Sequence, residues 1–81
     1  MSEHADAAEV VLDAKGLKCP LPVLRARKAL RDVPPGGLLR VLATDPGSIA
    51  DFQAYCDASA NELTEWRDDA GVYEFLIRRA S

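Results

Sequence analysis

The stretch Gly-Leu-Lys-Cys-Pro-Leu-Pro, residues 16–22, separates two segments whose apolar residues follow different periods. Before it, the apolar run at residues 10–12 is typical of a short buried strand. After it, apolar residues return at steps of three, four and three, as along one face of a helix: Val23, Ala26, Leu30 and Val33. Two prolines and two glycines at residues 34–37 end this helix. The sequence therefore predicts a strand, a proline-rich connection and a helix.

A second strand and a second helix follow. Residues 38–43 are nearly continuous in apolar side chains, which is typical of a strand covered on at least one face. The helix begins either with Asp45 as its cap before Pro46, or with a capping box formed by Ser48 and Asp51. Its apolar face is predicted to carry Ile49, Phe52 and Cys56.

Two further strands, at residues 63–67 and 72–79, are predicted to be joined by a hairpin loop at residues 68–71. The resulting order, βαβαββ, predicts a parallel first pair with a right-handed crossover and an antiparallel hairpin at the end. Two helices of modest length can cover only one face of four strands. We therefore expect an α/β (α+β) two-layer sandwich, with a four-stranded mixed sheet and both helices on one face.

Length and composition favour one small globular domain. The 81 residues are 48% hydrophobic and 28% charged, as in an ordinary folded domain. We place this domain at residues 10–80 and expect residues 1–9 to form a mobile tail. No apolar run approaches the roughly 20 residues that span a bilayer, and the acidic start does not resemble a secretory signal. We expect a cytoplasmic protein that does not enter a membrane.

The few cysteine and histidine residues exclude several kinds of chemistry. Cys19, Cys56 and His4 do not have the clustered spacing of a zinc site, so no metal is expected. A lone histidine near the terminus argues against a Cys-His dyad, and the absence of Cys-x-x-Cys argues against a dithiol cycle. We expect two free thiols. On its apolar helix face, Cys56 is interpreted as a buried structural thiol, the alternative being a resolving thiol for Cys19.

Cys19 is the strongest candidate for a reactive group. If it caps the first helix, Pro20 takes the first helical position, where proline is favoured. Pro20 and Pro22 have no N–H, so the N–H of Leu21 is expected to point near the sulfur. The helix terminus and nearby basic residues then predict a Cys19 pKa lowered from about 8.5 to about 7.5. Such a thiol can accept a sulfane sulfur as a persulfide and pass it on, without a cofactor. The alternatives are an inert packing residue, or a redox sensor in a regulatory binding module.

Positive charge is concentrated around this motif. Between residues 15 and 40, seven Lys and Arg stand against one Asp, so that segment carries +6 and the rest of the chain −9. The candidates for docking an acidic partner protein are Lys15, Lys18, Arg25 and Lys28. The alternative is that they only occupy a solvated helix face. Direct nucleic-acid binding is not expected, because the net charge is −3 and no basic patch is interleaved with aromatic residues.

The motif and its surroundings resemble the TusA/SirA-type sulfur-carrier family. Members share a Leu-Asp-x-x-Gly-x-x-Cys-Pro-x-Pro signature, and residues 12–22 meet every fixed position. The resemblance continues through Pro35-Gly36, Thr44-Asp45-Pro46, residues 51–56 and residues 73–79. It therefore extends over nearly all of residues 11–79.

The resemblance implies the same sandwich fold, with a persulfide carried on Cys19. It implies that a cysteine desulfurase or rhodanese-like protein donates the sulfur, and that a downstream relay protein accepts it. In tRNA-thiolation carriers an acidic residue stands where this chain has Leu21. The pathway therefore stays open between tRNA thiolation, sulfur oxidation, molybdenum-cofactor synthesis, selenium metabolism and thiosulfate uptake. Turnover is expected to require both partner proteins.

Overall fold

The computed structural model describes residues 9–80 and confirms the βαβαββ order. The elements are β1 (Glu9–Ala14), α2 (Leu21–Ala29) with a 3₁₀ turn (Leu30–Asp32), β2 (Leu38–Ala43), α3 (Ser48–Ala58), β3 (Glu62–Asp69) and β4 (Val72–Arg78). Glu9, which we had assigned to a tail, is the first residue of β1. The remainder of that expected tail, residues 1–8, lies outside the described residues.

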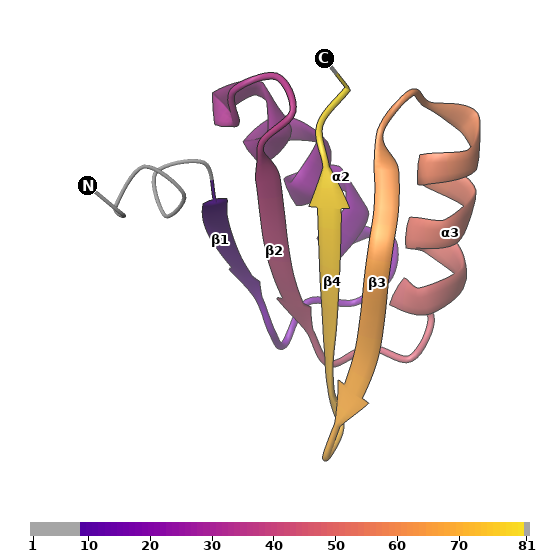
Figure 1. The fold of residues 1–81 in the computed structure, drawn as a ribbon. Helices are drawn as coiled ribbons and strands as arrows, with labels where there is room; N and C mark the ends of the chain where they lie inside the picture. Colours follow the sequence, from indigo (N-terminus) through magenta and orange to yellow (C-terminus); the bar gives the residue numbers. More distant parts are fainter. Residues whose placement is uncertain (1–8, 81) are drawn as a thin grey trace.

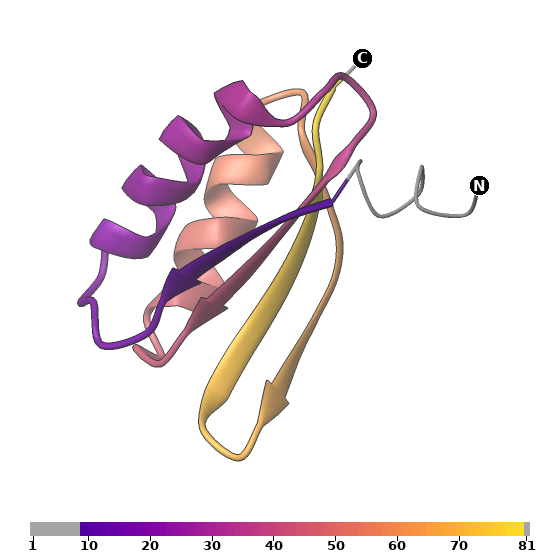
Figure 2. The same ribbon diagram turned by 90° about the vertical axis from the view of Figure 1, so that its left-hand side faces the viewer.

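The four strands form one mixed sheet in the order β1-β2-β4-β3 (Figure 1). β1 and β2 are parallel, with Glu9 opposite Leu38 and Ala14 opposite Ala43. β4 runs antiparallel to both β2 and β3. Both helices lie on the same face of the sheet (Figure 2). The predicted two-layer sandwich is therefore confirmed.

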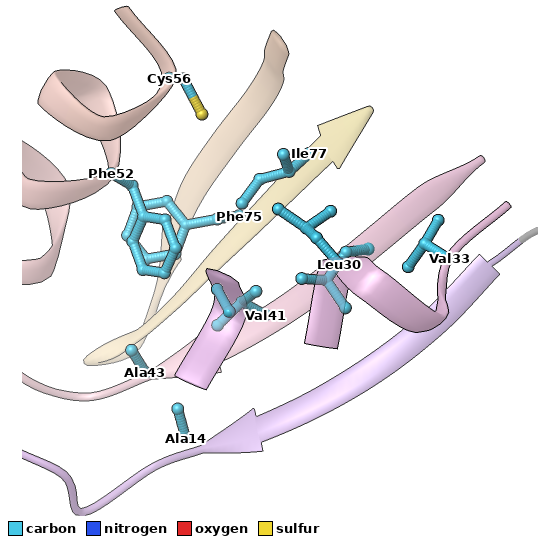
Figure 3. Close-up of a cluster of buried hydrophobic side chains, with 11 residues drawn as sticks. Ala14, Leu30, Val33, Val41, Ala43, Phe52, Cys56, Phe75 and Ile77 are labelled. Atoms are coloured by element: carbon cyan, nitrogen blue, oxygen red, sulfur yellow. The ribbon is translucent and has the colours of Figure 1, made fainter. Parts of the chain in front are cut away.

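Alternation along the two central strands directs their apolar side chains toward the helices. Leu39, Val41 and Ala43 of β2, with Phe75 and Ile77 of β4, are fully buried. From α3, Phe52 stacks on Phe75 with ring centroids 4.5 Å apart and an interplanar angle of 29° (Figure 3). This pair holds α3 against the sheet, and burial of one such ring contributes about 1.5–3 kcal/mol.

The uncovered face of the sheet is partly occupied by an ion-pair network. Arg40, in the centre of β2, donates to Glu9 on β1 at 2.7 Å and to Glu74 on β4 at 2.9 Å. Arg67 of β3 reaches the same Glu74 carboxylate at 3.1 Å. These contacts link all four strands on the side that the helices leave open.

The closing hairpin is tighter than expected. β3 continues to Asp69, so the turn consists of Ala70 and Gly71 alone, with φ of 53° and 91°. Two successive positive φ angles are typical of the two-residue turns that match the twist of a hairpin. Asp68 also accepts the N–H of Gly71 at 3.0 Å. The prediction of a four-residue loop at residues 68–71 was therefore wrong. The loop is two residues shorter, because Asp68 and Asp69 belong to β3.

Candidate functional site

Two loops meet at one end of the sheet because β1 and β2 are parallel neighbours. The loop after β1 contains residues 15–20 and the loop after β2 contains residues 44–47. Both leave the lower end of the sheet in Figure 1. The N–H of Gly16 donates to Oγ1 of Thr44 at 2.9 Å, which joins the two loops directly. Cys19 lies in the first of them, at the carboxyl ends of the strands, where α/β folds commonly place functional groups.

Asp45 holds the two loops together through its carboxylate. Its Oδ2 accepts the backbone N–H of Cys19 at 2.5 Å, and its Oδ1 accepts the N–H of Gly47 at 3.1 Å. These two backbone donors, together with the positive charge of Lys18, lower the pKa of Asp45. The N-cap of α3 is Gly47, without a side-chain cap. Asp45 therefore connects the Cys19 backbone to the chain segment that leads into α3.

The Cys19 thiol is exposed and contacts the first turn of α3. Its Sγ donates a hydrogen bond to Oδ2 of Asp51. Glycine at position 47 permits this approach, because a Cβ there would lie 3.2 Å from the Cys19 Cβ and 3.4 Å from Sγ. Asp51 is a site residue that the sequence analysis assigned only to helix capping. Its signals in the sequence were the Ser48-x-x-Asp51 spacing and its place at the start of residues 51–56, through which the family resemblance continues.

The predicted capping geometry of Cys19 is wrong. α2 begins at Leu21, with Pro20 as its N-cap, and the Cys19–Pro20 peptide bond is cis. The N–H of Leu21 donates to the carbonyl of Lys18 at 2.8 Å, so it is already occupied within the loop. Pro22 is a buried residue of the first turn of α2. The three motif residues after Cys19 therefore shape the loop and the helix start, and Leu21 does not serve as the predicted donor to the sulfur.

The predicted direction of the Cys19 pKa shift is also wrong. The hydrogen bond to Asp51 is the largest influence on this thiol; with partial desolvation and the negative charges of Asp51 and Asp45, it raises the pKa of Cys19 from 9.0 to about 11. The basic residues that adjoin Cys19 in the chain predict a lowered pKa. The two carboxylates come from 26 and 32 positions away and act in the opposite direction.

The four basic residues proposed for docking remain accessible. Lys15, Lys18, Arg25 and Lys28 are all exposed. Within residues 9–80 none of them forms an ion pair with an acidic side chain. Leu21 and Leu24 of α2 are exposed as well, at 44% and 46%. The start of α2 therefore presents both apolar and positively charged surface close to the loop that carries Cys19.

Cys56 is separated from solvent, as predicted. It is 8% exposed on the inner face of α3, and the structure has no disulfide between it and Cys19. Burial, followed by the negative charge of Asp57, raises the pKa of Cys56 to about 11. Within residues 9–80, no three His, Cys, Asp or Glu side chains gather to hold a metal ion. No helix in that part of the chain is long and apolar enough to cross a membrane.

These features define a small α/β protein with an exposed cysteine in the loop at one end of its sheet. The model of the family described as Sulfurtransferase TusA matches residues 10–79. The chain belongs to this TusA sulfurtransferase family, as its similarity to individual members also shows.

Several relatives match over most of their length. The sulfur carrier protein TusA of Allochromatium vinosum is 49% identical over 69 residues, covering 85% of this chain and 91% of that protein. The protein of the same name from Pseudomonas aeruginosa is 42% identical over 73 residues, covering 90% and 92%. The crystal structure of the SirA-like protein from Desulfitobacterium hafniense superposes with a TM-score of 0.75 at 32% identity, covering 88% and 97%. The similarity includes both the sequence and the fold.

Proposed function

We propose that this protein is a sulfur carrier that holds a sulfane sulfur as a persulfide on Cys19. The observation that carries the proposal is the contrast between the chain's two thiols: Cys19 is exposed at the end of the sheet, whereas Cys56 is buried in the core. A carrier that exchanges sulfur with other proteins needs one accessible sulfur atom. The curated relatives that match most of this chain are named sulfur carrier proteins, which supports the same function.

The transfer is a thiol exchange in which atoms and electrons balance. The Cys19 sulfur attacks the terminal sulfur of a donor persulfide, and a new S–S bond forms on Cys19. The S–S bond of the donor breaks, and its electron pair leaves with the donor cysteine, which takes up the proton that Cys19 loses. Delivery is the same exchange, with an acceptor thiol attacking the terminal sulfur on Cys19. No net oxidation occurs, and this chain supplies no cofactor to the exchange.

The donor we propose is a cysteine desulfurase or a rhodanese-like protein, and the acceptor is a further protein of a sulfur relay. The exposed side chains of Lys15, Lys18, Arg25 and Lys28 support docking of an acidic protein surface near Cys19. Exchange between proteins that present a persulfide or a thiol needs neither a membrane nor direct contact with nucleic acid. We place the carrier in the cytoplasm, where free thiols persist.

A regulatory module that uses Cys19 as a redox sensor is the competing function. Sensor cysteines are accessible and have a lowered pKa, because the thiolate is the form that peroxides oxidise. Cys19 is accessible, but its pKa is raised to about 11 by its hydrogen bond to Asp51. A carrier thiol needs to be activated only in contact with its donor. The hydrogen bond to Asp51, which keeps the thiol protonated in the free protein, therefore does not match the pattern of a sensor cysteine.

Intact-mass measurement distinguishes these two functions. The protein is incubated with a cysteine desulfurase, cysteine and pyridoxal phosphate, the last being the cofactor of the desulfurase. We expect a gain of about 32 Da that dithiothreitol removes, as for a persulfide. The gain should be absent in Cys19→Ala and present in Cys56→Ala. Oxygen adducts or a disulfide without the sulfur adduct would contradict the carrier function and support the sensor.

A further inference from the structure

The acidic surroundings of Cys19 are unusual for a nucleophile that receives sulfur. Its thiol donates to Asp51 on α3, and its backbone N–H donates to Asp45 in the loop after β2. Lys18, in the same loop as Cys19, lowers the pKa of Asp45, so its positive charge acts on that carboxylate. A thiolate at this position would face two carboxylates. The neutral thiol, in contrast, can donate its proton to one of them.

We propose that Asp51 keeps the empty carrier unreactive by holding the proton on Cys19 until contact with the sulfur donor breaks their hydrogen bond. The inference rests on the proposed carrier function for its purpose, but it concerns the free protein. A carrier moves between partner proteins, and a permanent thiolate would be oxidised or exchange with unrelated disulfides on the way. Asp51 thereby confines the nucleophile to the complex with the donor.

The local backbone fixes Asp51 in place for this role. Its own N–H donates to the carbonyl of Gly47 at 3.2 Å, so the carboxylate projects from a formed helical turn. Gly47 also donates its N–H to Asp45, the residue that binds the Cys19 backbone. The missing Cβ at Gly47 lets this turn lie against Cys19. The distance between thiol and carboxylate is therefore set by backbone contacts on both sides.

The same chemistry limits this control to the empty carrier. In the unloaded protein Sγ bears the hydrogen that Asp51 accepts. In a persulfide, Sγ is bonded to Cβ and to the terminal sulfur, and it has no hydrogen left to donate. The contact between Sγ and Asp51 is then lost. The terminal sulfur has no proton to donate either, because a persulfide is more acidic than a thiol and is ionised at neutral pH. Asp51 thus distinguishes the empty carrier from the loaded one by the presence of a single proton.

The size of the effect follows from the ionisation of the thiol. The pKa of Cys19 is raised from 9.0 to about 11, with the Asp51 hydrogen bond as the largest cause. At neutral pH this corresponds to about one thiolate in ten thousand, against about one in a hundred without the shift. Desolvation and the charge of Asp45 also contribute to the shift, and the site is exposed to solvent and salt, so the difference that Asp51 alone makes is smaller than this 100-fold limit.

The test is the rate at which iodoacetamide alkylates Cys19 as a function of pH. Asp51→Asn keeps the size of the side chain but removes its charge. The parent protein and every variant compared carry Cys56→Ala, so only Cys19 reacts. Asp57→Asn is the matched control, because Asp57 lies exposed on the same helix and acts on Cys56 rather than on Cys19. Circular dichroism checks that each variant is folded.

We expect Asp51→Asn to react at least threefold faster at pH 7–8, with its pH midpoint moved toward 9, while Asp57→Asn matches the parent protein. A smaller ratio at every pH, or an equal acceleration in the control, overturns the proposal. Persulfide loading is measured separately by intact mass and is expected to persist in Asp51→Asn. If the parent protein fails to load, the carrier function fails. The alkylation ratio still decides the role of Asp51 in that case.

Discussion

Gly47→Ala is expected to change the chemistry of Cys19 while leaving the fold intact. The added Cβ would stand 3.2 Å from the Cβ of Cys19 and 3.4 Å from its Sγ. Carbon atoms in favourable contact are about 3.5–4.0 Å apart, so Cys19 must move by a few tenths of an ångström. Such a movement separates the thiol from Asp51, because Gly47 and Asp51 belong to the same turn.

The backbone at Gly47 does not oppose this substitution. Its φ of −64° and ψ of −16° lie in the right-handed helical region, which alanine adopts freely. Replacing glycine by alanine stabilises a compatible site by about 0.4–1 kcal/mol through the unfolded chain. Alanine is a poorer N-cap than glycine by a similar amount, roughly 0.5–1 kcal/mol. We therefore expect the free energy of unfolding to change by less than about 1 kcal/mol.

Urea unfolding and Cys19 alkylation, both in a Cys56→Ala background, measure the two effects separately. We expect the alkylation midpoint of Gly47→Ala to fall from about 11 toward 9, because the hydrogen bond to Asp51 weakens. In an Asp51→Asn background the same substitution should have no further effect on the midpoint. This double-variant comparison distinguishes a loss of the Asp51 contact from simple crowding of the sulfur.

An unchanged alkylation midpoint in Gly47→Ala would refute the reasoning, since it would mean that Cys19 accommodates the added methyl group and keeps its hydrogen bond to Asp51. A shift of equal size in the presence and absence of Asp51 would also refute it. In that case the methyl group would act on the sulfur directly. A large loss of stability would contradict the expected compatibility of alanine with this backbone.

Four further predictions concern the docking surface, the second cysteine and the core. Reversing charge in Arg25→Glu/Lys28→Glu should slow loading by the desulfurase, mainly through a lower association rate that depends strongly on salt; equal rates would place the docking face elsewhere. Cys56→Ala should load sulfur as fast as the parent, and slower loading would assign Cys56 a resolving role. Between pH 9 and 11 the unfolded chain loses the Cys56 proton while the folded chain keeps it, so the unfolding free energy should fall with rising pH, less steeply in Cys56→Ala; equal slopes would count against a raised pKa. Phe52→Ala should lower the unfolding free energy by roughly 3–5 kcal/mol in urea, because the ring is fully buried on Phe75; a loss under about 1 kcal/mol would contradict that packing.

The architecture could be predicted from the sequence because it depends on local patterns. Phe52 and Cys56 are buried where helical periodicity placed them, and Leu38–Ala43 is the strand that its apolar run indicated. The parallel pairing of β1 with β2 followed from the strand–helix–strand order. The two-residue turn at Ala70 and Gly71 was missed, since the strand pattern gave no sign that β3 would extend to Asp69.

Only the part of the site that depends on neighbouring residues in the chain, the position of Cys19, could be predicted from the sequence. The signature placed Cys19 between the first strand and the first helix, and the structure has it there. The contacts that determine its ionisation are not local, because Asp45 and Asp51 follow it by 26 and 32 positions. A pattern of Ser48 and Asp51 at capping distance was compatible with a purely structural role. Ser48 is in fact buried, and Gly47 caps the helix instead.

The parallel pairing of β1 and β2 explains how Cys19 and Asp51, which are 32 positions apart in the chain, come into contact. The loops that follow these two strands lie at the same end of the sheet. Cys19 belongs to the first βα connection, and Asp51 belongs to the helix that follows the second. The core beneath them, centred on Phe52 and Phe75, involves neither side chain. We therefore expect substitution of Asp51 to change the reactivity of Cys19 without disturbing either the core or the exposed surface of α2. If both proposals hold, recognition of partners and reactivity of the sulfur can vary independently within one framework.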